Sequence, residues 1–290
     1  MAVSPLLIGA HVSIAGGIEK SFARGAAVGC TAIQVFTRNA SRWQAKPLAD
    51  EDISAFRAAR ERSSIGYVAA HDSYLINLAS PDSELRHKSI AAFVDEMLRC
   101  SQLGINDLVM HPGAHVGQGF EAGMNNLVES FRQVFAEAPL DVRVLVENTA
   151  GQGTCLGARF EELAEIFERL PQGNLAVCFD TCHAFAAGYD LTTAESYAQV
   201  MTEFERLLGL ETLALFHMND SKKTLGSRVD RHDHVGRGHI GPDGFRALMQ
   251  DARFARIAKI IETPPGDNHC DDFINLQLLR EFAGVTTEDG

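Results

Sequence analysis

The 290-residue chain lacks any apolar run long enough to cross a membrane, because no stretch approaches the roughly 18 consecutive apolar residues that a spanning helix needs. Residues 1–5 carry neither the basic segment nor the apolar core of a secretory signal. The six cysteines are widely scattered and form no Cys-x-x-Cys pair. We therefore expect a cytoplasmic protein with no membrane contact and with reduced, mostly buried thiols.

Basic residues are scarce relative to acidic ones. Lysine and arginine number 26 against 38 aspartate and glutamate, which gives a formal charge of -12. Taken alone, this charge argues against a nucleic-acid partner, since phosphate binding normally needs a basic surface. Apolar residues make up 46% of the chain, which is enough for a large core and excludes global disorder.

Short apolar, β-branched runs alternate with helical patterns along the whole chain, as expected for repeated strand–helix units. No Gly-rich phosphate turn follows the first run, which argues against an open doubly wound sheet, and no Pro-rich or Ser-rich linker divides the sequence. We predict an α/β fold, a (β/α)8 TIM barrel that forms one domain over residues 1–290, with short flexible ends at about 1–5 and 284–290. The eight predicted strands are 6–13, 32–37, 67–73, 107–112, 142–148, 175–181, 213–219 and 257–263.

The helical pattern is clearest at 81–103 and 157–170, where large apolar residues recur at spacings of three and four. The segment 219–241 is long, polar and rich in basic residues and histidine. We therefore expect it to be a functional loop.

Seven of the eight predicted strands end in histidine or a carboxylate, and the carboxyl ends of barrel strands meet at one mouth. A lone histidine there is more often a satisfied polar residue, and a buried carboxylate is usually paired with arginine. The convergence of so many such groups is difficult to stabilise without metal. These strand-end residues are His11, His71, His111, Glu147, Asp180 with nearby His183, His217 and Glu262.

Imidazole and carboxylate ligands favour zinc or manganese, and their number exceeds what one ion can coordinate, which indicates a polynuclear site. Cys178 and Cys182 flank Asp180, so a thiolate ligand is an alternative there. We favour the interpretation that both cysteines pack as small buried residues.

Nine ordered motifs identify the family that this chain resembles. They occupy 9–13, 36–39, 71–78, 110–113, 146–151, 178–183, 217–222, 228–232 and 261–264. The chain closely resembles the endonuclease IV family, the zinc-dependent apurinic/apyrimidinic endonucleases of base-excision repair, over about residues 6 to 285. The resemblance implies a trinuclear zinc site, with manganese as an alternative at some positions.

The family's ligand positions carry over one by one. His71 and His111 resemble ligands of one zinc, and Glu147 resembles the bridge to a second. The second ion would be completed by Asp180, His217 and Glu262, and the third would be held by His183, Asp230 and His232.

The resemblance implies hydrolysis of the phosphodiester 5′ to an abasic site in duplex DNA, which leaves a 3′-hydroxyl and a 5′-deoxyribose phosphate. Removal of blocked 3′ ends is an implied second activity. Glu147 and Glu262 are the implied catalytic residues, because Glu147 organises the metal pair and Glu262 orients the nucleophile. We expect a monomer.

The implied DNA contacts lie in the loops that follow the strands. Tyr74 and Leu75 match the family's wedge residues. The family's inserted arginine aligns with Ser41, so Arg38 and Arg42 remain open as its substitutes. Arg231 is a further expected contact.

Two other functions compete with this interpretation. A metal-dependent TIM-barrel sugar isomerase would need a substrate-polarising lysine at a strand end, and none of the predicted strands ends in one. A non-catalytic protein that binds DNA lesions is disfavoured by the complete ligand set. The negative charge does not exclude DNA, because three divalent ions would add +6 at the mouth and basic residues gather in the loops there.

Overall fold

The computed structural model describes residues 6–139, 141–264 and 266–285. The flexible ends predicted at about 1–5 and 284–290 lie outside the described residues, except for residues 284 and 285. Among the described residues, no helix is both long and apolar enough to traverse a lipid bilayer.

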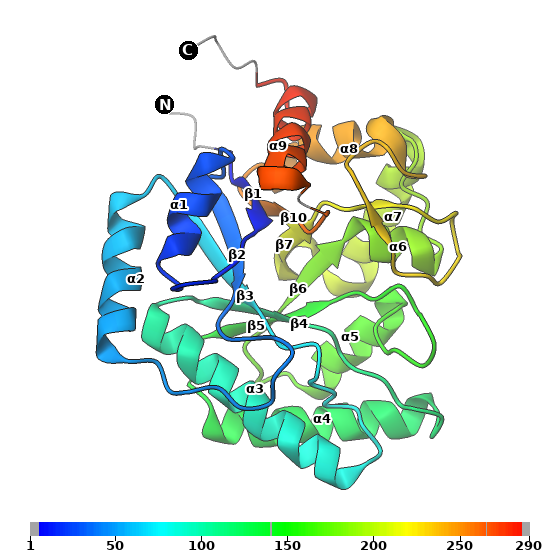
Figure 1. The fold of residues 1–290 in the computed structure, drawn as a ribbon. Coiled ribbons are helices and arrows are strands. Elements are labelled where there is room, and N and C mark those ends of the chain that lie inside the picture. Colours follow the sequence, from blue (N-terminus) through cyan, green and yellow to red (C-terminus); the bar gives the residue numbers. More distant parts are fainter. Residues whose placement is uncertain (1–5, 140, 265, 286–290) are drawn as a thin grey trace.

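Eight parallel strands close into a barrel, in the order β1-β10-β7-β6-β5-β4-β3-β2 (Figure 1). Each strand lies inside a range predicted from the sequence, so the prediction of a (β/α)8 barrel is confirmed. The strands are β1 Ile8–His11, β2 Ala32–Phe36, β3 Tyr67–His71, β4 Asp107–Met110, β5 Arg143–Glu147, β6 Leu175–Asp180, β7 Leu213–His217 and β10 Ala258–Ile261.

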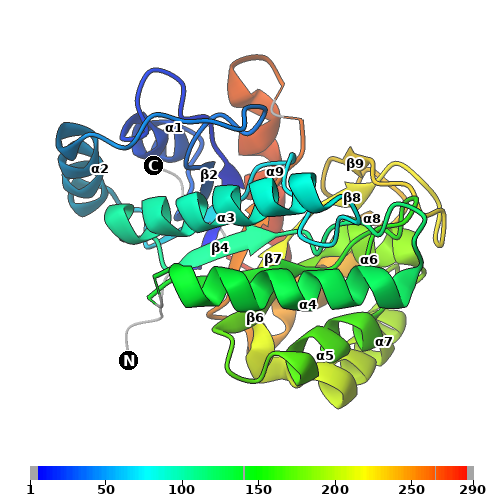
Figure 2. The same cartoon turned by 90° about the horizontal axis from the view of Figure 1, so that it is seen from below.

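Helices surround the barrel, and α3, α4 and α5 lie side by side along one flank (Figure 2). The helices are α1 Lys20–Ala27, α2 Asp50–Arg62, α3 Ser83–Leu103, α4 Phe120–Glu137, α5 Phe160–Arg169, α6 Thr181–Ala187, α7 Ala194–Leu208, α8 Gly241–Gln250 and α9 Cys270–Phe282, with short 3-10 turns at Leu210–Thr212, Ala252–Phe254 and Asp267–His269. Both helices that the sequence indicated most clearly are present, as α3 and α5. The sequence pattern located α3 by periodicity alone, but its start is fixed by Asp82, whose carboxylate accepts hydrogen bonds from the backbone N–H groups of Glu84 and Leu85.

The predicted loop 219–241 contains a small antiparallel pair, β8 Asp220–Ser221 and β9 His232–Asp233. Strands of two residues are too short to show an alternating pattern, so the sequence indicated only a polar loop. The pairing joins residues 220–221 to residues 232–233 beside α6.

The core has two layers, one inside the barrel and one between the strands and the helices. The inner layer is built mainly from small and medium side chains, as a narrow barrel requires: Ala32, Ala69, Val109, Leu145, Ala176, Cys178, Leu215, Ala258 and Ile260. Cys178 is therefore part of the barrel filling. The outer layer holds the large side chains, including Phe93, Phe131, Phe160 and Phe204.

Candidate metal centre

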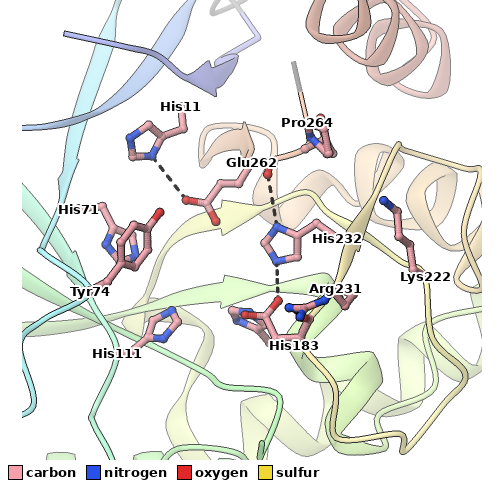
Figure 3. A pocket seen from close by; sticks show the side chains of 12 residues that line it. His11, His71, Tyr74, His111, His183, Lys222, Arg231, His232, Glu262 and Pro264 are labelled. Carbon is pink, nitrogen blue, oxygen red and sulfur yellow. Dashed lines mark hydrogen bonds and ion pairs between the residues drawn. The ribbon is translucent and has the colours of Figure 1, made fainter. Parts of the chain in front are cut away.

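The period of two along each strand places the predicted ligands in the mouth of the barrel. Side chains two residues apart on a strand point to the same side. Six predicted ligands each follow an inner-layer residue by two positions, so they point toward the barrel axis one layer higher. These ligands are His71, His111, Glu147, Asp180, His217 and Glu262. Of these six, His71, His111 and Glu262 line a cavity of about 550 Å³ that opens to solvent (Figure 3). Glu147, Asp180 and His217 are completely buried.

The first cluster consists of His71, His111 and Glu147, on β3, just after β4, and on β5. The Nε2 atoms of both imidazoles lie 3.3 Å from Oε2 of Glu147. Glu147 is completely buried, whereas His111 is partly open to the cavity.

The central cluster shares Glu147 with the first one. Nδ1 of His217 lies 3.2 Å from Oε1 of Glu147, 3.3 Å from Oε2 of Glu262 and 3.8 Å from Oδ2 of Asp180. The two carboxylate oxygens of Glu147 therefore face two different clusters, which is the geometry of a bridging ligand.

The third cluster joins α6 to the β8–β9 segment. Asp180 caps α6 by accepting a hydrogen bond of 2.7 Å from the backbone N–H of His183. The ring of His183 is oriented by the carbonyl oxygen of Asn148, which lies 3.0 Å from its Nδ1. Nε2 of His183 and Nε2 of His232 each lie 3.3 Å from a different oxygen of Asp230. The nine predicted ligands thus form three clusters, and within each the ligand atoms lie within 4.8 Å of one another.

The spacing of these atoms fits zinc. Two ligand atoms that are each 2.0–2.1 Å from a zinc ion at tetrahedral angles are separated by about 3.3 Å. Within the clusters, the closest imidazole–carboxylate contacts of His71, His111, His183, His217 and His232 measure 3.2 to 3.3 Å, longer than the 2.9 Å typical of an N–H···O hydrogen bond. Between clusters, Nδ1 of His183 lies 3.0 Å from Oε1 of Glu147. In addition, Nε2 of His232 is buried without a hydrogen-bond partner among the described residues. A buried acceptor nitrogen beside two carboxylates is well satisfied by a cation.

The electrostatics of the site support the same conclusion. Burial alone would raise the pKa of Glu147, but the imidazoles of His217 and His111 hold it well below its usual value. Burial would lower the pKa of His183, but Asp180, Asp230 and Glu147 raise it well above the usual value. Without metal, the clusters therefore depend on positively charged imidazoles to balance buried carboxylates.

Burial raises the pKa of the Cys178 thiol well above its usual value and that of Cys182 to about 12. Both sulfur atoms lie close to ligand atoms of the centre, Cys178 near Glu147 and Cys182 near Asp180. In the absence of a bound cation, the raised pKa values favour the thiol form of both cysteines.

Three polar residues that were not predicted from the sequence support the ligands. Asn219 donates a hydrogen bond of 2.6 Å to Oδ2 of Asp180 and accepts one of 2.7 Å from the backbone N–H of Glu262. Asn148 exchanges two hydrogen bonds with the backbone of Asp180. Gln34 contacts both His217 and Glu262. Each of these amides lies inside or shortly after an apolar strand, and that position could have indicated them. The prediction considered only histidine and carboxylate at strand ends.

The predicted DNA-contact residues are placed unequally. Tyr74 projects into solvent above His71, with its ring centroid 6.3 Å from that imidazole, and Leu75 beside it is half-buried. Arg42 and Arg231 are exposed at the same mouth, where Arg231 lines the cavity.

Arg38 differs from its prediction as a DNA contact. Its side chain is buried, its Nε lies 2.6 Å from Oε1 of Glu96, and its Nη1 donates to the backbone carbonyl of Trp43. The guanidinium is held within the protein because it neutralises a buried carboxylate. Arg38 therefore anchors the loop that carries Arg42, and of the two substitutes only Arg42 presents its charge to solvent.

Comparisons with known proteins agree with this geometry. A family model described as a xylose isomerase-like TIM barrel matches residues 22–280. Over 280 residues, the chain is 52% identical to a protein of Chloroflexus aggregans named probable endonuclease 4, covering 96% of this chain and 98% of that one. The crystal structure of endonuclease IV from Thermus thermophilus matches with a TM-score of 0.85 and 37% identity, covering 97% of this chain and 100% of that one.

A D-tagatose 3-epimerase-like protein shares the fold, with a TM-score of 0.74 over 96% of this chain and 97% of that one. Its identity of 18% shows likeness of fold alone. The two endonuclease matches are far closer and extend over nearly the full length of both chains. The chain therefore belongs to the endonuclease IV family, among the xylose isomerase-like TIM barrels.

Proposed function

We propose that this protein is an apurinic/apyrimidinic endonuclease that hydrolyses the phosphodiester 5′ to an abasic site in duplex DNA. The products are a 3′-hydroxyl and a 5′-deoxyribose phosphate, and removal of blocked 3′ ends is a second proposed activity. The observation that carries the proposal is the set of three ligand clusters in one open cavity, two of which share Glu147. The names of the relatives, which are endonucleases, support the choice of nucleic acid as substrate.

The proposed cofactor is three zinc ions, with manganese as an alternative at some positions. His71 and His111 with Glu147 would hold the first ion, and His183 with Asp230 and His232 would hold another. Asp180, His217 and Glu262 would hold the remaining ion in the central cluster. Glu147 would be shared between this ion and the first. Such ions supply a nucleophile at neutral pH and neutralise the negative charge that develops on a phosphoryl group.

The protein's own residues position the reactants. Glu147 is fixed from both sides by imidazoles, so its two oxygens cannot rotate away from the clusters that they join. Glu262 reaches over the cavity from the end of β10, and its Oε1 lies 3.6 Å from Nδ1 of His11 (Figure 3). We assign Glu262 to orienting the attacking water, because it is the ligand carboxylate that both joins the central cluster and lines the open cavity.

The rim of the cavity supplies the proposed DNA contacts. Exposed Tyr74 and half-buried Leu75 would form an apolar wedge of the kind that stabilises a distorted base stack. Arg42 and Arg231 provide charge for backbone phosphates. Arg38 contributes through the loop that it anchors. We further propose that the protein acts as a monomer in the cytoplasm.

A duplex that carries one abasic site separates this proposal from its rivals. Purified, zinc-loaded protein should cut that duplex on the 5′ side of the lesion and leave a matched intact duplex uncut, and elemental analysis should give about three ions per chain. Binding without incision would favour a lesion-binding protein. Epimerisation of a ketose without incision would favour a sugar-converting enzyme. Absence of 5′ incision at full zinc occupancy would falsify the nuclease proposal.

A further inference from the structure

Gln34 is a polar residue in the middle of an apolar strand. It lies on β2, two positions after the inner-layer residue Ala32, and its side chain is completely buried inside the barrel. A buried amide lowers stability unless its donors and its acceptor are satisfied. The groups that satisfy Gln34 all belong to the mouth of the barrel, so its position is linked to the site.

Three side chains contact the amide of Gln34. Its Oε1 lies 2.8 Å from Nε2 of His217. Its Nε2 donates a hydrogen bond of 2.7 Å to Oε1 of Glu262 and lies 3.0 Å from Nδ1 of His11. An amide nitrogen has two donor hydrogens and the oxygen accepts, so these three contacts use both ends of the side chain.

The chemistry of the partners fixes the direction of the amide. A carboxylate only accepts hydrogen bonds, so the nitrogen end must face Glu262 and the oxygen end must face His217. His217 then donates from Nε2, which leaves the lone pair of its Nδ1 unprotonated in the neutral ring. Nδ1 is the atom that faces Glu147 and the other oxygen of Glu262, at 3.2 and 3.3 Å.

Three acceptor atoms consequently converge at the central cluster: Nδ1 of His217, Oε1 of Glu147 and Oε2 of Glu262. When the ring of His217 is neutral, its one N–H hydrogen faces Gln34, so no hydrogen lies between these three atoms. Such a convergence is stable around a cation and unfavourable without one.

We propose that Gln34 is the positioning residue of the central cluster, which selects the metal-binding tautomer of His217 and aims Oε2 of Glu262 at the ion. This inference rests on the proposed metal-dependent function. The side-chain partners of Gln34 within the described part of the chain are His11, His217 and Glu262. Since none of these belongs to the first or the third cluster, those two clusters do not depend on Gln34 in the same way.

Two variants separate positioning from simple space-filling. Gln34→Met retains the length and volume of the side chain but removes both polar ends. Gln34→Glu retains an acceptor for His217 but places a second carboxylate against Glu262. The matched control is Gln102→Glu, which makes the same chemical change at an exposed position.

Each protein is loaded with Zn²⁺ and dialysed against increasing chelator, and the retained zinc is measured by elemental analysis. We expect both Gln34 variants to lose one ion per chain at an affinity reduced by about 10- to 100-fold, with the other ions retained as in wild type and in the control. Equal zinc retention by wild type and by both folded variants would overturn the inference while leaving the metal centre intact. A wild-type chain that retains no zinc would overturn the metal centre as well.

The tautomer of His217 gives a readout that does not depend on any Gln34 variant. In a ¹⁵N-histidine spectrum of the zinc-loaded wild type, the signals of His217 are assigned by their loss in His217→Gln. We expect a hydrogen on Nε2 and none on Nδ1. A hydrogen on Nδ1 would overturn the inference.

Discussion

Asp220 acts as a clamp, since it holds together the two ends of the segment 221–241, which contributes Asp230 and His232 to the third cluster. Replacing Asp220 therefore tests how that cluster is held. Its buried carboxylate accepts four backbone hydrogen bonds from both ends of the segment. Oδ1 accepts from Ser221 at 2.7 Å and from Ile240 at 2.9 Å. Oδ2 accepts from Gly238 at 3.0 Å and from Gly241 at 3.2 Å.

The conservative change Asp220→Asn converts one of these oxygens into an amide that faces two N–H donors. A hydrogen bond to a charged group contributes about 1.5–3 kcal/mol, so losing two of them should cost about 3–6 kcal/mol. That cost is a large fraction of the roughly 5–15 kcal/mol by which a domain is stable. Because the lost bonds all lie at the base of one segment, we expect local opening of 221–241 before the barrel unfolds.

Asp230 and His232 belong to this segment, so its opening separates them from His183. The measurements are amide hydrogen exchange of 221–241, urea unfolding, and zinc retained after dialysis. The control is Asp243→Asn, which removes only an exposed ion pair with Arg246, worth less than about 1 kcal/mol. If Asp220→Asn exchanges, unfolds and retains zinc as the control does, the clamp argument is wrong.

Three further changes test the site and the core. Glu262→Gln should lower incision at an abasic site by at least about 100-fold, while binding to abasic duplex, measured by fluorescence anisotropy, stays near wild type; retained turnover would contradict its assigned role. Tyr74 is 74% exposed, so Tyr74→Ala should leave thermal unfolding unchanged and weaken binding to abasic duplex by about 1–3 kcal/mol, and unchanged affinity would remove it from the interface. Burial lowers the pKa of Lys259 from its ordinary 10.5 to about 8. Between pH 8 and pH 10.5, this lysine therefore binds more protons in the unfolded chain than in the folded one. The free energy of unfolding of the wild type, relative to Lys259→Met, should therefore rise by about 3 kcal/mol from pH 8 to 10.5, and parallel pH profiles of the two proteins would refute this.

The barrel could be predicted from the sequence because its strands are covered on both faces. Such strands appear as continuous apolar runs, as in β5, where Val144, Leu145 and Val146 are all completely buried. The position of the ligands followed from the same fact, since any parallel barrel brings the carboxyl ends of its strands to one mouth. Glu147 and Glu262 therefore stood out as charged residues at the ends of strands that are otherwise apolar.

The supporting contacts could not be predicted, because each depends on a partner that is remote in sequence. Gln34 contacts Glu262 across 228 positions, and Arg38 pairs with Glu96 across 58. Nothing near Arg38 in the sequence indicates that a carboxylate on α3 will remove its charge from the surface. The clamp at Asp220 likewise depends on backbone N–H groups about 20 residues further along the chain, which no side-chain pattern reveals.

Net charge is a poor guide to the partner of this protein because the charges are unevenly placed. Glu147 and Asp180 are completely buried and Glu262 lines the cavity, so part of the acidic excess lies in the mouth itself. Without metal, protonated imidazoles offset part of this negative charge, and exposed arginines such as Arg42 and Arg231 supply further attraction for a phosphate backbone. Three divalent ions would offset half of the formal charge of -12, and all of that compensation falls where the phosphate must bind. Under the proposed function, metal loading therefore makes the mouth more attractive to the phosphate backbone of DNA.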